Sequence, residues 1–347
     1  MEKRKKDRIW YLECLRVLAM LSVISFHVSK TALSDFSFSL FTSSCLLCVR
    51  NLVHYAVPIF FMISGALLLN PNKNLSIERL CKHYLIKYLL ITVLFGGVYS
   101  CLEQIFDKKT ISWPVIRSGI DNMIHGDSWA HMWYMYTLIW VMMLLPVLRL
   151  IVYKFKKEEI KYTIVVIMMF VSFTGIINAY SSRELGITYP INFIYCFYML
   201  VGYWIHNNVF KFKEKTSIII LVVIIFVLCA LAFMDIYNVI TCEPWIGNQS
   251  PLIVLYSILI FNLGHLKIKE RAENKIIKNI VTSLSENSFL IYLLHMFWIN
   301  ILYKWINFNP FSFNPFIGFI TIFLLVLLLS YVSSLLVKKI PIINKLF

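Results

Sequence analysis

Apolar stretches of membrane-spanning length alternate with short polar segments along the whole chain of 347 residues. A helix needs about 20 predominantly apolar residues to cross the hydrocarbon core of a bilayer. The pattern predicts ten such helices, at residues 9–29, 47–69, 84–105, 131–152, 161–180, 189–206, 216–236, 250–266, 286–306 and 315–337. No linker, internal repeat or soluble module interrupts them, so we expect one all-α transmembrane domain over 1–347, a single polytopic bundle.

The composition supports this prediction. The chain is 59% hydrophobic and only 15% charged, with a mean hydropathy of +0.74, which excludes a soluble domain of this length. The N-terminus has a basic run followed by an apolar stretch, but no small-residue cleavage site follows. We therefore interpret residues 9–29 as a retained first span rather than as a signal peptide.

The net charge of +15 would fit a nucleic-acid-binding protein, but the distribution of the charge indicates membrane topology instead. Six predicted loops and ends hold 24 of the 33 Lys and Arg residues: 1–8, 70–87, 154–161, 207–215, 265–280 and 338–347. The opposite side holds only Lys30, Arg50, Lys108, Lys109, Arg117, Arg183 and Lys304. The positive-inside rule then places both termini in the cytoplasm of a multi-pass protein of the bacterial cytoplasmic membrane, in contact with lipids and not with nucleic acid. The basic inner face can also attract anionic lipid or an anionic cosubstrate.

Two ionisable side chains lie within the first predicted span. Arg16 and His27 are eleven residues apart, about three helical turns, so they share one stripe of the helix and lie roughly 16 Å apart. Ionisable residues in a membrane helix are costly and usually mark a pathway or a reaction centre. Imidazole suits proton transfer near neutral pH, so His27 is a candidate general base. Arg16 either pairs with Glu13 one turn away or contacts an anionic or carbonyl group of a substrate.

The second span contains a proline and a small-residue pair. Pro58 leaves a backbone carbonyl without its helical partner, and Ser64-Gly65 favours close helix packing, which is the reading we prefer. Cys45 and Cys48 form a CxxC pair with no second ligand pair nearby, so we expect no metal or redox site.

Polar groups also mark the fourth and ninth spans. The fourth begins with His131, Trp133 and Tyr134, which suit either an interfacial anchor or a platform for a hydroxyl-bearing substrate. In the ninth span, a polar stripe must face the bundle interior. It consists of Ser288, Tyr292 and His295, spaced i, i+4 and i+7. This stripe either handles protons or forms hydrogen bonds between helices, worth under about 1 kcal/mol each.

At these residues the chain resembles membrane-bound acyltransferase family 3, which includes surface-polysaccharide O-acetyltransferases. Four patterns occur in family order across nearly the whole chain. They are Arg-x10-His (Arg16 and His27), Pro-x-Phe-Phe-x-x-Ser-Gly (Pro58 to Gly65), His-x-Trp-Tyr (His131 to Tyr134) and Ser-x-x-x-Tyr-Leu-x-His (Ser288 to His295). The match looks nearest to the branch that acetylates enterobacterial common antigen. O-antigen acetylases carry a Trp-Ser-Leu-x-x-Glu pattern in this region. The segment from Trp133 to Leu138 has neither the Ser nor the Glu of that pattern, so we assign no acidic residue to the site.

The resemblance implies an acyltransferase that takes an acetyl group from acetyl-CoA, without a metal, and passes it to a carbohydrate hydroxyl across the membrane. His27 then matches the essential histidine of the family and Arg16 its paired arginine. In direct transfer His27 removes the proton of the acceptor hydroxyl, and Arg16 orients the donor or polarises its carbonyl. An acyl-His27 intermediate is the alternative. The substrate-binding candidates are His131, Trp133, Tyr134, Ser288, Tyr292 and His295.

Two other classes of function compete with this reading. Buried ionisable stripes also occur in translocators, which would export a small polar molecule or a polysaccharide without acyl chemistry. Against that, the sequence shows no paired broken half-helices in corresponding positions of two halves. A receptor or scaffold would leave His27 unexplained.

Overall fold

The computed structural model describes residues 8–73, 75–181, 193–209, 212–268 and 274–347. Within these ranges the chain is 81% helical and has no strands, which agrees with the predicted all-α class. Several sequence predictions fall outside the described residues. They are Arg183, the start of the predicted span 189–206, most of the basic segment 1–8 and parts of the segments 207–215 and 265–280.

Six described helices are long and apolar enough to cross a membrane. They are α1 (Trp10–Asp35), α2 with α3 (Leu40–Leu52 and Ala56–Leu68), α4 to α6 (Ile77–Leu80, Ile86–Ile91 and Gly97–Lys108), α13 (Glu214–Ile236), α14 with α15 (Glu243–Ile246 and Pro251–Lys267) and α17 (Pro315–Val337). A seventh span is formed if α8 (Trp133–Met143) and α9 (Leu145–Lys154), bent by 52°, are taken together. Pro146 lies in the first turn of α9, where its missing N–H and its ring favour such a bend.

Three of the ten predicted spans lack a helix that meets the same length and apolarity criteria. The region 161–180 contains α10 (Lys157–Ile167) and α11 (Phe173–Tyr180), joined by a π-helical turn. The region 189–206 contains the 14-residue α12 (Phe193–His206), and the region 286–306 contains the end of α16 (Lys275–Asn300). α16 is 26 residues long but polar on one stripe, because that stripe faces the bundle interior. The remaining helices, α7 (Trp113–His125) and α18 (Pro341–Asn344), are not spans.

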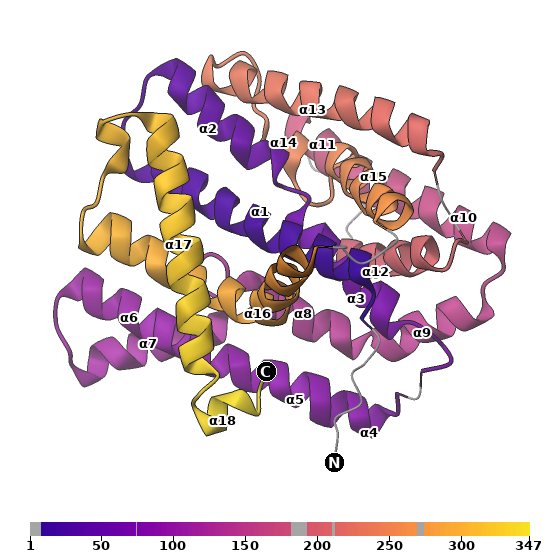
Figure 1. Ribbon diagram of the computed structural model, residues 1–347, viewed down its shortest axis with the longest axis horizontal. Coiled ribbons are helices and arrows are strands. Elements are labelled where there is room, and N and C mark those ends of the chain that lie inside the picture. The colour runs from indigo at the N-terminus through magenta and orange to yellow at the C-terminus, as the bar shows by residue number, and fades with distance from the viewer. Residues whose placement is uncertain (1–7, 74, 182–192, 210–211, 269–273) are drawn as a thin grey trace.

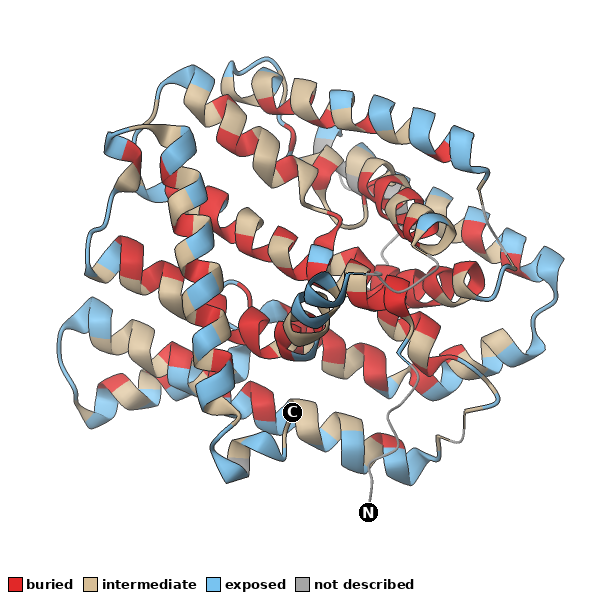
Figure 2. Cartoon of the chain, in the orientation of Figure 1, coloured by how far each residue is buried: buried red, intermediate tan, exposed pale blue. Residues whose placement is uncertain are grey.

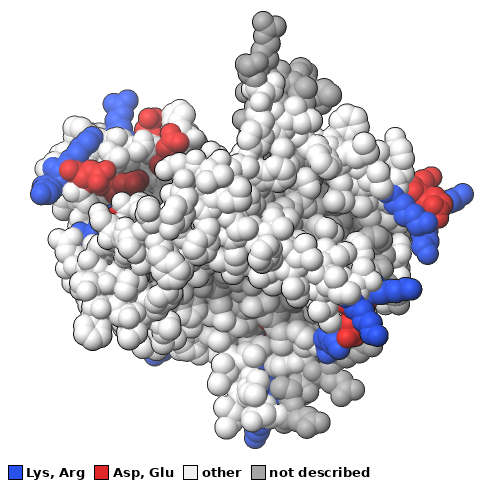
Figure 3. All heavy atoms as spheres, turned by 90° about the horizontal axis from the view of Figure 1, so that it is seen from above, with Lys and Arg blue, Asp and Glu red and all other residues white. Residues whose placement is uncertain are grey.

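The surface indicates how the bundle meets the membrane. The α6–α7 connection lies at one end of the long axis and the α9–α10 connection at the other (Figure 1). Charged side chains gather toward these ends, and the surface between them is mostly uncharged in Figure 3. The apolar side chains of α13 and α17 are largely exposed, for example Phe226 and Leu328. Exposed apolar helix faces of this size suit contact with lipid.

Close packing of α3 against α12 forms the centre of the bundle, where buried residues concentrate (Figure 2). A Cβ at Gly65 would lie 1.9 Å from the backbone oxygen of Met199, and one at Gly202 would lie 2.1 Å from that of Met62. Only glycine lets the two backbones approach this closely. The packing interpretation is therefore confirmed for Gly65, whereas Ser64 lines two cavities described below.

Arg149, which falls within the predicted fourth span, has a structural role. Its guanidinium donates to the backbone carbonyls of Leu68 and Pro71 at 3.3 Å and of Lys73 at 2.5 Å. Carbonyls at a helix C-terminus lack helical partners, and arginine satisfies them here. The contacts tie α9 to the segment after α3.

A histidine cluster at one end of a row of cavities

Three cavities follow one another through the bundle. The histidine cavity, about 250 Å³, is lined by Val23, Phe26, His27, Lys30, Val53, His54, Ala56, Val57, Ala130, His131, Trp133, Tyr134, Asn248 and Tyr292. The middle cavity, about 170 Å³, is lined by Arg16, Val23, Val57, Phe60, Ser64, Tyr88, Tyr134, Leu138, Ser288, Phe289 and Tyr292. The arginine cavity, about 430 Å³, is lined by Arg8, Ile9, Leu12, Glu13, Arg16, Phe60, Ile63, Ser64, Leu67, Leu68, Lys73, Tyr84, Tyr88 and Tyr134. Neighbouring cavities share lining residues, and Tyr134 lines all three.

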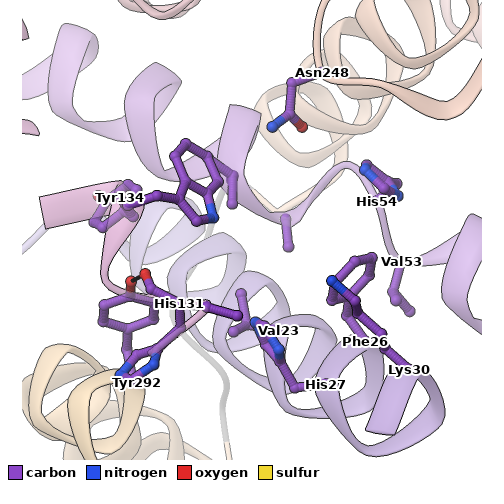
Figure 4. Close-up of a pocket in the computed structure, with 14 residues that line it drawn as sticks. Val23, Phe26, His27, Lys30, Val53, His54, His131, Tyr134, Asn248 and Tyr292 are labelled. Atoms are coloured by element: carbon purple, nitrogen blue, oxygen red, sulfur yellow. Dashed lines mark hydrogen bonds between the residues drawn. The ribbon is translucent and has the colours of Figure 1, made fainter. Parts of the chain in front are cut away.

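Three histidines from three helices or helix starts meet at the histidine cavity. His27 comes from α1, His131 from the turn before α8 and His295 from α16. The ring centroid of His27 lies 5.0 Å from that of His295 and 6.5 Å from that of His131, and the His131 and His295 rings are 5.3 Å apart. All three side chains are buried. Figure 4 shows His27 with His131 and Tyr292 on one side and with Phe26 and Lys30 on the other.

Hydrogen bonds fix the proton positions on two of these rings. Nδ1 of His295 lies 2.5 Å from the backbone oxygen of Tyr292, and Nε2 of His131 lies 3.3 Å from that of Leu293. A carbonyl oxygen only accepts, so these two nitrogens carry the protons when the rings are neutral. The other nitrogens, Nε2 of His295 and Nδ1 of His131, are buried without a partner among the described residues. Each retains a lone pair that can accept a proton.

Tyrosines hold the turn before α8 against α16. The hydroxyl of Tyr292 donates to the backbone oxygen of His131, and the hydroxyl of Tyr99 donates to that of Leu293 at 2.7 Å. Tyr99 also stacks on Trp129, with ring centroids 4.3 Å apart. The histidines therefore sit on a rigid support rather than on mobile loops.

Arg16 lies at the other end of the middle cavity. Its Nη1 pairs with Oε1 of Glu13 at 3.1 Å and donates to the hydroxyl of Ser285 at 3.0 Å. Helical side chains tilt toward the N-terminus, and both contacts draw Arg16 in that direction, away from His27. Arg16 also lines the middle and arginine cavities. It can therefore pair with Glu13 and contact a substrate at the same time, and the two alternatives left open by the sequence are compatible.

The structure brings most of the predicted site residues together. His27, His131, Trp133, Tyr134 and Tyr292 line the histidine cavity, and the ring of His295 packs against that of His27. Ser288 lines the middle cavity and donates back to the carbonyl of Ser285 at 2.8 Å. These positions are geometric findings, and the functional roles of the residues stay predictions.

Three polar residues of the histidine cavity were missed by the sequence analysis as site residues: Lys30, His54 and Asn248. His54 had a usable signal, because it lies four residues before Pro58, which favours a break in the helix nearby. The structure places the break at residues 53–55, between α2 and α3, and irregular backbone in a membrane occurs where it lines a cavity. Asn248 lies in the connection between α14 and α15, where no periodic pattern identifies an inward side chain.

The described His, Cys, Asp and Glu side chains include no group of three or more that could hold a metal ion. The eight cysteines are free thiols. The reactive groups that line the histidine cavity are imidazoles, tyrosine hydroxyls and the ammonium of Lys30.

Comparison with known proteins identifies the family. Residues 9–335 match the profile of acyltransferase family 3, described as an acyltransferase domain. Curated relatives include the protein named "Probable poly-beta-1,6-N-acetyl-D-glucosamine export protein" of Staphylococcus aureus strain Mu50, 24% identical over 279 residues that cover 75% of this chain and 73% of the relative. The protein of the same name from strain NCTC 8325 is 23% identical over the same shares. No solved structure matches the chain significantly. The match over nearly the whole chain shows that this protein belongs to acyltransferase family 3 and is a multi-pass membrane acyltransferase.

Proposed function

We propose that the protein transfers an acetyl group from cytoplasmic acyl-CoA to a hydroxyl of a cell-surface glycan or of its lipid-linked precursor. The observation that carries the proposal is the row of cavities, with a cationic cavity at one end and a histidine cluster at the other. The curated relatives are named for a polysaccharide, which supports a carbohydrate acceptor. Assignment to the branch that acetylates enterobacterial common antigen stays a prediction.

The donor would enter through the arginine cavity. Arg8, Arg16 and Lys73 line it. Glu13 is the one carboxylate of the lining, and Arg8 also pairs with Glu286, so a net positive charge remains that favours an anionic ligand such as the phosphates of coenzyme A. The flexible pantetheine arm could then extend through the middle cavity and deliver the thioester past Tyr134 to the histidine cavity. Direct contact of Arg16 with the reacting carbonyl is disfavoured, because Arg16 and His27 are roughly 16 Å apart along one continuous helix. We therefore assign Arg16 to orienting the donor.

At the histidine cavity, His27 would take the proton of the acceptor hydroxyl as its oxygen attacks the thioester carbon. The carbon–sulfur bond then breaks, the acetyl ester remains on the acceptor and the proton passes to the departing thiolate of coenzyme A. General-base assistance of this kind contributes roughly 10² to 10⁴ in rate. His131 and His295 would position the ring of His27, which is their neighbour. Attack by His27 itself, through an acyl-His27 intermediate, is the alternative.

The proposal requires the arginine cavity to face the cytoplasm. The positive-inside rule predicts the same orientation, with both termini inside and ten crossings of the membrane. We expect a cysteine at the exposed positions of Glu158 or Lys275 to react with a membrane-impermeant maleimide only from the cytoplasm. A cysteine at Thr110 or Phe313 should react only from outside. Labelling in intact cells and in inverted vesicles, in a background without the native cysteines, measures both. Reaction of position 158 from outside would refute the ten-span topology.

The activity itself can be measured on purified protein. With acetyl-labelled acetyl-CoA and isolated envelope glycans, including enterobacterial common antigen, we expect label to enter the glycan as an alkali-labile ester with one coenzyme A released per acetyl group. The control is the same reaction with label on the adenine of coenzyme A, which should leave the glycan unlabelled. Absence of labelled glycan with every acceptor would reject the proposed donor or acceptor class.

Export is the second candidate, because the curated relatives carry the name of an export protein and because the three cavities form a row through the bundle. A pure exporter would move glycan across proteoliposome membranes without acetyl-CoA and without forming an ester. Measuring both glycan flux and ester formation in the same proteoliposomes separates the two functions.

A further inference from the structure

The lining of the histidine cavity is polar but unevenly charged. Lys30 is its only Lys or Arg residue, and no Asp or Glu lines it. Among the described residues no hydrogen bond or ion pair is found for the ammonium of Lys30. Lys30 is exposed at the edge of the cavity, and a cation there with no anion beside it attracts an anionic ligand group.

The spacing of Lys30 and His27 limits where that anion can be. Both side chains project from α1, three residues apart, so they lie about 4.5 Å apart along the helix axis on the same face (Figure 4). An anion held by Lys30 and a hydroxyl held by His27 would therefore belong to the same sugar ring or to adjacent substituents of it.

The wall formed by α8, α12 and the α14–α15 connection offers neutral recognition groups. Asn248 is held in place by two tyrosines of α12: its Nδ2 donates to the hydroxyl of Tyr195 at 3.0 Å, and its backbone oxygen accepts from the hydroxyl of Tyr198 at 2.6 Å. Its Oδ1 has no partner among the described residues. Trp133, 38% exposed, packs on Tyr195 with ring centroids 5.7 Å apart and presents an aromatic surface to the cavity. Asn248 and Trp133 therefore give the same cavity an amide oxygen, which can accept from a hydroxyl, and an aromatic surface, which can pack against an apolar ring face.

We propose that the histidine cavity accepts a sugar that carries an anionic group, a phosphate or a carboxylate, next to the hydroxyl that is acylated. Lys30 pairs with the anion, Oδ1 of Asn248 accepts a bond from a neighbouring hydroxyl or amide N–H, and Trp133 packs against the ring. The cavity volume of about 250 Å³ is below the roughly 300 Å³ at which drug-sized sites begin, so it suits a single sugar unit. This inference rests on the proposed function for its acceptor but makes a separate claim about charge.

The first test measures binding without catalysis. Quenching of tryptophan fluorescence in purified protein should report N-acetylglucosamine 1-phosphate and glucuronate binding at least tenfold more tightly than methyl N-acetylglucosaminide, because a charge-assisted hydrogen bond is worth tenfold or more in affinity. Lys30→Gln should remove this preference, whereas Lys30→Arg, which keeps the positive charge, should retain it. The control is Lys304→Gln, which removes a positive charge outside the cavity and should also retain the preference. The phosphate and carboxylate arms distinguish a phosphate-linked sugar from a uronic acid. Equal affinity of wild type for charged and neutral sugars would overturn the inference.

The second test uses the reaction, with acetyl-CoA saturating. Lys30→Gln should raise the ratio of KM for the anionic acceptor to KM for the neutral acceptor about tenfold, and Lys304→Gln, the control outside the cavity, should leave this ratio unchanged. Asn248→Asp, which keeps the side-chain shape and adds a carboxylate to the cavity, should also reduce the preference for anionic acceptors. An equal loss on charged and neutral acceptors in Lys30→Gln would overturn the inference. Failure of every acceptor to be acetylated, with the binding preference intact, would instead reject the proposed function and leave an anionic-sugar binding site.

Discussion

Replacing His27 with glutamine should lower acetyl transfer to glycan by roughly 10² to 10⁴. Glutamine can form hydrogen bonds at this position, but it cannot accept the proton of the acceptor hydroxyl. His27 is 8% exposed, and the other α1 residues that line the cavity, Val23, Phe26 and Lys30, carry no imidazole that could take its place on this helix. The measurement is the initial rate of ester formation with labelled acetyl-CoA, and His27→Ala should be about as poor.

Two controls separate catalysis from folding. Binding of acetyl-CoA should survive in His27→Gln, because the arginine cavity is lined by none of the three clustered histidines. His125→Gln changes an exposed histidine that lies at the end of α7, outside the three cavities, and should retain wild-type turnover. A His27→Gln protein that still acetylates glycan at the wild-type rate would show that the catalytic assignment is wrong.

The sequence predicts the helical class and most of the crossings because long apolar runs are a strong signal. It is less successful where a helix is enclosed by other helices. α16 carries Ser288, Tyr292 and His295 on a stripe that packs inside the bundle, and this lowers its apolarity without preventing it from being a central element. The bend between α8 and α9 follows from Pro146, but its size of 52° depends on packing that periodicity does not contain.

The site was partly predictable for a similar reason. Residues on one helix stripe can be placed together by counting, which is how Arg16 and His27, and separately Tyr292 and His295, were identified. The convergence of His27, His131 and His295 on one cavity depends on contacts between α1, α16 and the start of α8, and spacing within one helix cannot supply it. Lys30 illustrates the limit, because charge counting assigned it to topology, whereas the structure also places it at the histidine cavity.

Arg16→Lys is expected to lose most of the activity, with the larger effect on KM for acetyl-CoA. Lysine keeps the positive charge but lacks the planar guanidinium with its several donors. Arg16 uses one nitrogen, Nη1, for its bonds to both Glu13 and Ser285, so its other nitrogens remain for a ligand in the middle or arginine cavity. A tenfold or greater rise in KM corresponds to the loss of one charge-assisted hydrogen bond to the donor. The measurement is ester formation over a range of acetyl-CoA concentrations at saturating acceptor.

The matched control for Arg16 is Glu13→Gln, which removes the ion pair and leaves the guanidinium in the cavity. If Arg16 orients the donor, Glu13→Gln should keep most of the turnover, because the amide oxygen of glutamine can still accept the hydrogen bond from Nη1 of Arg16. If Arg16 only balances the charge of Glu13, the order reverses: Arg16→Lys should work nearly normally, because lysine also pairs with a carboxylate. Near-normal KM and turnover in Arg16→Lys would therefore show that Arg16 has a structural role, in which it holds α1 against α16 through Ser285. In that case the cations that bind the donor would be Arg8 and Lys73 alone.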